Sequence, residues 1–162
     1  MDVNGFKGPN SEARNGKQYD IRSFKVAKFS TGCPGKDVDG IGCVYVLPSY
    51  SPIKAGSEEM KKWDPNWTEE KVGYFVSHDN YWAGAKKACD DIGMSLPDKS
   101  KLRSLGKKTD VEKEQLGLPT DGWFWSSSEG YAYSAYFVYI ISGNMRNDRK
   151  YYIGGKVLCV GD

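Results

Sequence analysis

Apolar side chains recur every three or four positions in one stretch of the chain, between residues 79 and 92. This spacing predicts an amphipathic helix, because residues three and four apart lie on the same helical face. Ser77 or Asp79 is expected to cap its first amide groups, and Gly93 is expected to end it in a left-handed conformation. The face expected to point into the core carries Trp82, Ala85, Cys89 and Ile92.

A second helix is predicted shortly afterwards. It begins within the stretch Leu96–Leu102, which places Pro97 and Asp98 at its front. Residues 48–70, by contrast, are polar and contain proline, glycine and serine, which is typical of a long surface loop. One short helix is expected within that loop, near residues 58–63.

Short β-branched and aromatic runs predict strands on either side of these helices. Residues 21–29 and 43–47 are expected to pair as a hairpin across a glycine-rich connection. Further strands, joined by glycine-containing turns, are predicted at residues 123–127, 133–141, 145–153 and 156–160. The chain is therefore expected to contain both helices and strands.

Length and charge narrow the classes of partner. The 162 residues are enough for one domain with a substantial core. The 23 Lys and Arg residues nearly balance the 21 Asp and Glu residues without a dense basic cluster, so nucleic acid is not an expected partner. No apolar run is long enough to span a bilayer, and no signal-peptide core is present, so we expect no membrane contact by this segment. The polar start at Met1–Gly5 fits a fragment of an exported protein and also an uncleaved cytosolic protein.

The four cysteines form an even set, which usually pairs in exported proteins. Cys33 and Cys43 flank residues 35–40, a loop that can fold back and bring them together. A bridge between Cys89 and Cys159 would close a large loop and stabilise the fold by several kcal/mol. The alternative is four buried free thiols in a cytosolic protein. A zinc site is not expected, because no close cysteine pair or neighbouring histidine supplies tetrahedral ligands.

Four short motifs occur in a characteristic order, namely Ala85–Cys89, Leu96–Leu102, Trp125–Glu129 and Cys159–Val160. From about Tyr74 to Asp162 the chain resembles the bacterial and phage C-type-lectin-like domains, including the variable proteins of diversity-generating retroelements. The resemblance implies an α+β C-type-lectin-like fold, with two helices packed on twisted antiparallel strands. It also implies a Cys89–Cys159 disulfide between the first helix and the last strand. Residues 1–72 would then be an N-terminal extension and hairpin, and residues 73–162 the lectin-like domain with a variable C-terminal region.

In such variable proteins a reverse transcriptase rewrites adenines, so diversified positions draw on a set of residue types without Trp, Glu, Gln, Lys and Met. Between Gly130 and Arg149 only Met145 lies outside that set. Tyrosine offers rigid contact area, and asparagine offers adaptable hydrogen bonds. We therefore expect a surface-displayed or secreted protein that binds a protein or cell-surface ligand, or a glycan. The residues expected to bind it are Tyr131, Tyr133, Tyr136, Tyr139, Asn144, Arg146, Asn147 and Asp148.

Strand alternation gives these tyrosines an expected arrangement. Tyr131, Tyr133 and Tyr139 are expected to line one face, while Val138 and Ile140 pack inward. The alternative interpretation is ordinary half-buried packing of tyrosines in a sheet.

A second resemblance concerns the start of the chain. Residues 2–10 and 19–24 resemble a segment in the globular heads of bacterial type IV pilin-like proteins. Those proteins carry an N-terminal hydrophobic helix, which this sequence lacks. The alternative function is therefore a structural pilin or pseudopilin subunit with a lectin-like head.

Catalytic and metal-binding chemistry finds little support in the sequence. His78 is the single histidine and is expected to be a surface or capping residue, and residues 123–128 are interpreted as scaffold. A glycoside hydrolase using Glu129 with Asp148 remains a third hypothesis. We expect no enzyme, no cofactor and no metal, because the twelve-residue spacing of a calcium loop is missing around Asp2, Asn4, Asp37 and Asp39.

Overall fold

The computed structural model describes residues 5–7, 9–10 and 32–161 of the chain. The chain forms two units, residues 1–34 and residues 35–162. In the first unit, strand β1 (Gly5–Lys7) pairs in parallel with β2 (Pro9–Asn10). The strand predicted at residues 21–29 and most of the pilin-like segment lie outside the described residues. The predicted boundary at residue 73 falls within the second unit and stays a prediction.

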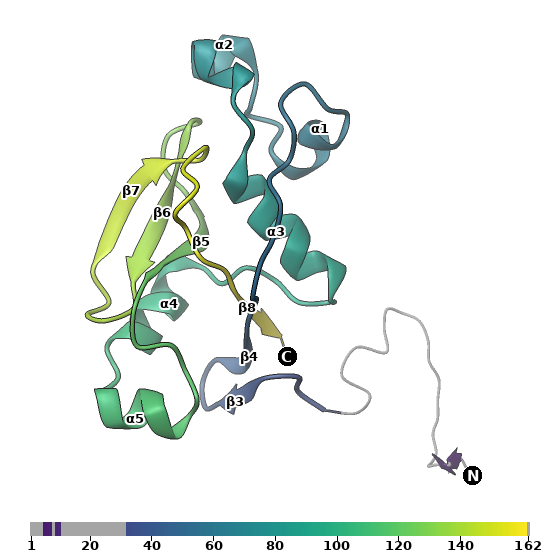
Figure 1. The fold of residues 1–162 in the computed structure, drawn as a ribbon, viewed down its shortest axis with the longest axis vertical. Helices are drawn as coiled ribbons and strands as arrows, with labels where there is room; N and C mark the ends of the chain where they lie inside the picture. Colours follow the sequence, from purple (N-terminus) through teal and green to yellow (C-terminus); the bar gives the residue numbers. More distant parts are fainter. Residues whose placement is uncertain (1–4, 8, 11–31, 162) are drawn as a thin grey trace. The chain divides into compact units, whose positions relative to one another are not determined.

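The second unit mixes helices with two antiparallel sheets, which confirms the expected α+β class (Figure 1). One sheet has the order β3-β4-β8 and is made of Lys36–Val38, Gly42–Val46 and Leu158–Gly161. The other has the order β5-β6-β7 and is made of Trp123–Glu129, Ser134–Tyr139 and Met145–Arg149. The last strand thus pairs with an early one, with Val44 opposite Val160.

The strand predicted at residues 43–47 is confirmed as β4, but its hairpin partner is not the predicted one. β4 pairs with β3 on one edge and with β8 on the other. β3 lies in the predicted glycine-rich connection, and its strand character is hard to predict because the run is only three residues long and polar in two of them. Val38 is its single buried side chain, and it packs in the core.

Six short helical segments lie between β4 and β5 in sequence. They are α1 (Glu59–Trp63), α2 (Glu69–Val72), the 3-10 helix η1 (Gly73–Ser77), α3 (Tyr81–Asp91), α4 (Lys99–Gly106) and α5 (Asp110–Gln115). The predicted short helix, first long helix and second helix correspond to α1, α3 and α4. In the described part of the chain, none of the helices is long and apolar enough to cross a bilayer.

The ends of α3 correct one prediction and confirm another. Neither Ser77 nor Asp79 caps the helix, because Asn80 holds the cap position and accepts a hydrogen bond from Ala83 N at 2.8 Å. Gly93 has a φ of 76°, the left-handed conformation expected after the helix. Ile92, predicted to face the core, is instead 40% exposed.

The main core lies where α4 packs against β5 and β6, and it includes side chains of the β3-β4-β8 sheet. It consists mainly of Val38, Val44, Leu102, Leu105, Phe124, Val138, Ile140, Leu158 and Val160. A second cluster lies around α1, α2 and α3 and consists of Ile53, Met60, Trp67, Val72 and Ala83. The main core joins the β5-β6-β7 sheet to α4, and the second cluster packs against residues near the β5–β6 turn, including Tyr133.

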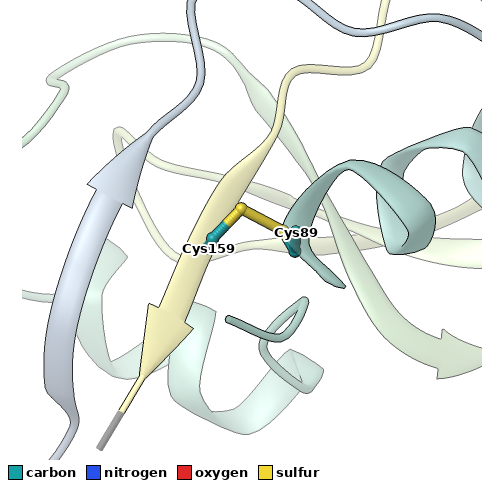
Figure 2. The surroundings of a disulfide bond; sticks show 2 residues. All are labelled: Cys89 and Cys159. Carbon is teal, nitrogen blue, oxygen red and sulfur yellow. A yellow bond between two sulfur atoms is a disulfide. The ribbon is translucent and has the colours of Figure 1, made fainter. Parts of the chain in front are cut away.

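A disulfide joins α3 to β8 through Cys89 and Cys159, as the resemblance implied (Figure 2). Both cysteines are completely buried, and 70 positions separate them in sequence. Cys33 and Cys43 are disulfide-bonded as well, so the alternative of free thiols is wrong.

Candidate functional site

The β5-β6-β7 sheet presents two chemically different faces. Its register places Trp123 opposite Tyr139, and Phe137 opposite Arg146. Directly opposed residues of antiparallel strands share a face, so these four side chains lie on one side of the sheet. The other side carries Phe124 and packs into the main core.

We call Trp123, Tyr139 and Arg146 the open face. The rings of Trp123 and Tyr139 stack with centroids 4.3 Å apart and an angle of 15° between their planes. The guanidinium of Arg146 lies 5.8 Å from the Trp123 ring centroid, within cation–π range. Both rings are half-buried and Arg146 is exposed. Trp123, interpreted from sequence as scaffold, is therefore part of the accessible surface.

Buried aromatic residues support the open face from within the same side of the sheet. Trp125 packs edge-on against Phe137 at 4.1 Å between centroids, and Tyr152 covers Phe137 at 5.4 Å. Trp125 Nε1 donates a hydrogen bond to the Tyr50 hydroxyl, which in turn donates to the Gly155 carbonyl. Burial raises the pKa of Tyr50 to about 12, so the phenol stays protonated and keeps donating at neutral pH. The scaffold interpretation holds for Trp125.

The predicted tyrosines do not share one face. Tyr136 lies on the core side of the sheet, at its rim, with the ammonium of Lys99 4.0 Å from its ring centroid. Tyr131 and Tyr133 precede β6, so strand alternation does not govern them. Val138 and Ile140 do pack inward, as expected.

Tyr131 and Tyr133 instead form one wall of a hollow of about 220 Å³ at the β5–β6 turn. We call this hollow the turn pocket; it is lined by Tyr131, Tyr133, Ser134, Asn147, Asp148 and Arg149. The two tyrosine rings stack at 5.6 Å, and Tyr131 is 66% exposed. Ser134 Oγ accepts a hydrogen bond from Tyr131 N, which fixes the turn. Asn144 lies in the β6–β7 turn, at the opposite end of β6.

The aromatic surface continues beyond the predicted segment onto η1. The Phe75 ring lies 5.4 Å from both Tyr133 and Tyr151, and Arg149 lies 5.5 Å above it. His78 is exposed, as expected, and stacks on Tyr151 at 4.3 Å. Sequence reasoning missed these neighbours, because a 3-10 helix has no long apolar period.

A buried ionic network lies directly behind the turn pocket. Lys150 follows β7, and its ammonium donates to Asp64 Oδ2 at 2.9 Å and to the Glu129 carboxylate. The Lys150 side chain is completely buried. Its carbonyl accepts hydrogen bonds from Tyr81 N and Trp82 N, so the same residue also holds the start of α3.

Two asparagines complete this network. Asn80 Nδ2 donates to Asp64 Oδ2 at 2.8 Å, and Asn66 Nδ2 donates to Glu129 at 3.1 Å. Partial burial raises the pKa of Glu129, but hydrogen bonds from Lys150 and Asn66 outweigh it and hold the pKa below its ordinary value. Glu129 is therefore a carboxylate at neutral pH.

Most of the second unit matches a known protein family. A family described as a domain of unknown function (DUF8780) matches residues 73–161, more than half of the chain. The chain belongs to this family. No curated protein matches the sequence.

Among solved structures, the DUF8780 chain is similar to the adhesin InvE of Yersinia pseudotuberculosis. The TM-score is 0.38, with 19% sequence identity over 46% of this chain. The match spans 22% of the length of that adhesin.

The far end of the sheet in the DUF8780 chain is anchored by a second buried lysine. Lys113 of α5 is completely buried, and its ammonium donates to the carbonyls of Ile140 at 2.6 Å and Ile141 at 3.1 Å. Gly106 of α4 meets the same turn, since a Cβ there would lie 2.7 Å from Gly143 Cα. Helices α4 and α5 thus fix the β6–β7 turn.

Metal-binding geometry can be assessed for the described part of the DUF8780 chain. Within it, no three His, Cys, Asp or Glu side chains gather closely enough to hold an ion. The acidic side chains nearest the turn pocket have other partners. Glu129 is hydrogen-bonded to Lys150 and Asn66, and Asp148 Oδ1 accepts from Arg149 N.

Proposed function

We propose that this chain is a secreted or surface-displayed ligand-binding protein that recognises a protein or cell-surface target without catalysing a reaction. The observation that carries the proposal is the accessible aromatic surface formed by the open face and the turn pocket. Tyr131 and Tyr74 are 66% and 74% exposed, although burial of large aromatic side chains is energetically favourable. Tyr131 stacks on Tyr133, and Tyr133 packs against Phe75, which neighbours Tyr74. Clustered exposed aromatic side chains of this kind are typical of binding surfaces.

The composition of the surface also favours recognition. Stacked pairs such as Trp123–Tyr139 and Tyr131–Tyr133 offer flat, rigid contact areas that lose little conformational entropy on binding. Arg146 and Arg149 add exposed guanidinium groups beside these rings. A protein target fits this mixture best, since tyrosine, tryptophan and arginine dominate binding energy at protein interfaces.

We further propose that the fold is C-type-lectin-like and that residues 130–149 are diversified by a retroelement. The helix order, the pairing of β8 with β4 and the Cys89–Cys159 bridge support the fold. The exposed side chains of β7 support diversification, because four of its five residues lie in the accessible set of residue types. Sequencing of the genomic locus tests this directly. An imperfect downstream repeat differing only at adenines, beside a reverse transcriptase gene, is expected.

The binding proposal is tested with a triple variant, Tyr131→Ala, Tyr133→Ala and Arg146→Ala. Fluorescently labelled protein is incubated with intact host and microbial cells, and bound fluorescence is measured by flow cytometry. We expect the triple variant to lose at least about tenfold in apparent affinity, which corresponds to about 1.4 kcal/mol. Protease treatment of the cells and a glycan array separate a protein target from a glycan.

A matched control keeps this experiment specific. Val111→Ala, Glu114→Ala and Gln115→Ala change three exposed residues of α5, away from the aromatic surface. This control is expected to stain cells as the wild type does. Equal staining by both triple variants would refute the assignment of the binding surface.

The absence of catalysis is a separate part of the proposal. Its support is the lowered pKa of Glu129 and the exposed, ring-stacked position of His78, the single histidine. A panel of glycan and ester substrates is expected to show no turnover. Turnover that disappears in Glu129→Gln would restore the hydrolase hypothesis.

A further inference from the structure

The ion pair between Lys150 and Asp64 is closed off from water. The two side chains expose 0% and 1% of their surfaces, and Lys150 Nζ lies 2.9 Å from Asp64 Oδ2. The Trp82 ring covers the ammonium, with its centroid 4.2 Å from Nζ. Removing two charges from water costs several kcal/mol per ion, which their attraction often fails to repay. A reaction that eliminated both charges would remove this cost.

The groups needed for amide formation are already in contact. Lys150 supplies an amine, Asp64 supplies a carboxyl group, and Glu129 hydrogen-bonds to Lys150 Nζ as a third, proton-accepting group. Asn66 N donates to Asp64 Oδ1 at 3.2 Å, and Asn80 Nδ2 donates to Oδ2 at 2.8 Å. Such donors stabilise the negative charge that develops on a carboxyl oxygen when a nucleophile adds.

We propose that Lys150 and Asp64 condense after folding into an intramolecular isopeptide bond, with Glu129 as the proton-transfer group. In the first step the Lys150 ammonium passes one proton to the Asp64 carboxylate, which leaves a neutral amine and a carboxylic acid. The amine lone pair then attacks Asp64 Cγ and forms the new C–N bond.

The second step expels water. Glu129 accepts one N–H proton from the tetrahedral adduct and delivers it to the departing hydroxyl oxygen. The C–O bond breaks, water leaves, and Glu129 returns to its carboxylate form. Overall, one ammonium and one carboxylate become one amide and one water, with no oxidant, reductant or co-reactant.

The surroundings favour this direction of reaction. Lys86 Nζ lies 4.0 Å from the same Trp82 ring. Burial lowers the pKa of Lys86, and the nearby charge on Lys150 lowers it too, although the carboxylates of Asp64 and Glu129 act in the opposite direction. Fixed proximity replaces a bimolecular encounter, and exclusion of water hinders hydrolysis of the product.

An exposed pair in the same chain serves as an internal control. Lys87 Nζ and Asp91 Oδ2 are 3.1 Å apart, but their side chains are 35% and 55% exposed. Water solvates both charges there, and no third group contacts the ammonium among the described residues. This pair is expected to remain an ion pair.

The test is the intact mass of the purified, disulfide-reduced protein. We expect the wild type and Lys87→Met to be lighter than their sequences by one water molecule each, and Lys150→Met to have its full mass. Protease digestion of the wild type should yield a branched peptide that joins Asp64 to Lys150. A wild type with its full mass and no branched peptide would overturn the proposal, and this result requires no variant to fold.

Glu129→Gln tests the proton-transfer role separately. Glutamine keeps the size and the hydrogen-bonding capacity of the side chain but cannot accept the proton. The variant is expected to keep the circular dichroism spectrum of the wild type and to show at least a tenfold slower loss of water. Condensation at the wild-type rate would remove Glu129 from the mechanism.

Discussion

The two ends of the β5-β6-β7 sheet are each anchored by a fully buried lysine, but with different partners. At the β5–β6 turn, Lys150 meets the carboxylates of Asp64 and Glu129. At the β6–β7 turn, Lys113 meets only the carbonyls of Ile140 and Ile141 among the described residues. One end is therefore a network of opposite charges, and the other is a charge bound to neutral dipoles.

The two lysines also differ in the number of elements that they connect. Lys150 joins β7 to α1, α3 and β5, elements that converge behind the turn pocket. Lys113 joins one short helix to one turn. Removal of Lys150 leaves the buried carboxylate of Asp64 without its counter-charge, whereas removal of Lys113 leaves only carbonyl groups unpaired. Neither anchor lies on the accessible surface between the two ends, because both lysine side chains are completely buried.

The largest expected effect is that of Lys150→Met. The methionine fills a similar volume but leaves Asp64 as an unpaired buried charge. We expect the free energy of unfolding to fall by about 3–5 kcal/mol. The isopeptide bond proposed above would make the loss larger. Urea denaturation monitored by tryptophan fluorescence measures it.

Lys113→Met should cost less, about 1–3 kcal/mol, because two carbonyls lose a donor and no charge is stranded. The same urea titration compares the two variants. Equal losses for the two lysines would mean that the carboxylates add nothing beyond hydrogen bonding, and the contrast between the two ends would disappear.

Thr109→Ala sharpens the comparison at the Lys113 end. Thr109 and Glu112 form a capping box at the start of α5, the helix that carries Lys113. Loss of such a cap costs about 1 kcal/mol. If α5 stabilises the fold mainly by positioning Lys113, the double variant Thr109→Ala/Lys113→Met should lose less free energy of unfolding than the sum of the two single losses.

The smallest effect on stability is expected between the two anchors. Tyr131→Ser and Arg146→Ser change exposed side chains and should each shift the free energy of unfolding by no more than about 0.5 kcal/mol. Thermal melts check this while the cell-binding assay records the loss of binding. A shift of several kcal/mol would instead favour ordinary packing of these residues in the sheet.

Much of the fold could be predicted from sequence, because the periodicity of apolar residues and the glycine and proline signals at element ends indicated the same helices and strands. The apolar stripe of α3 as far as Cys89, the front of α4 and the β-rich runs after residue 122 correspond to the structure. Two details were wrong: Ile92 is exposed, and the strand predicted at residues 145–153 ends at Arg149. The cap of α3 was missed because Ser77, Asp79 and Asn80 are all good capping residues within four positions. Local sequence alone does not choose among them.

The candidate site was harder to predict, for two physical reasons. β6 begins at Ser134, so Tyr131 and Tyr133 lie outside the strand and their side chains do not follow its alternation between the two faces. Lysine is usually exposed, and only the tertiary fold brings Asp64 within reach of Lys150, 86 positions away. The α5 capping box corresponds to a Thr-x-x-Glu motif at residues 109–112, a signal from which the start of this helix could have been predicted.

The Cys89–Cys159 bridge has a consequence for a protein exposed to proteases. The segment between the two cysteines contains the whole β5-β6-β7 sheet and exposed tips such as Ile153, which is 73% exposed. A single cut at such a tip leaves the two fragments covalently joined, so a nicked molecule would still migrate as one band until a reductant is added. The disulfide therefore keeps the sheet that carries the open face attached to the rest of the molecule after such a cut.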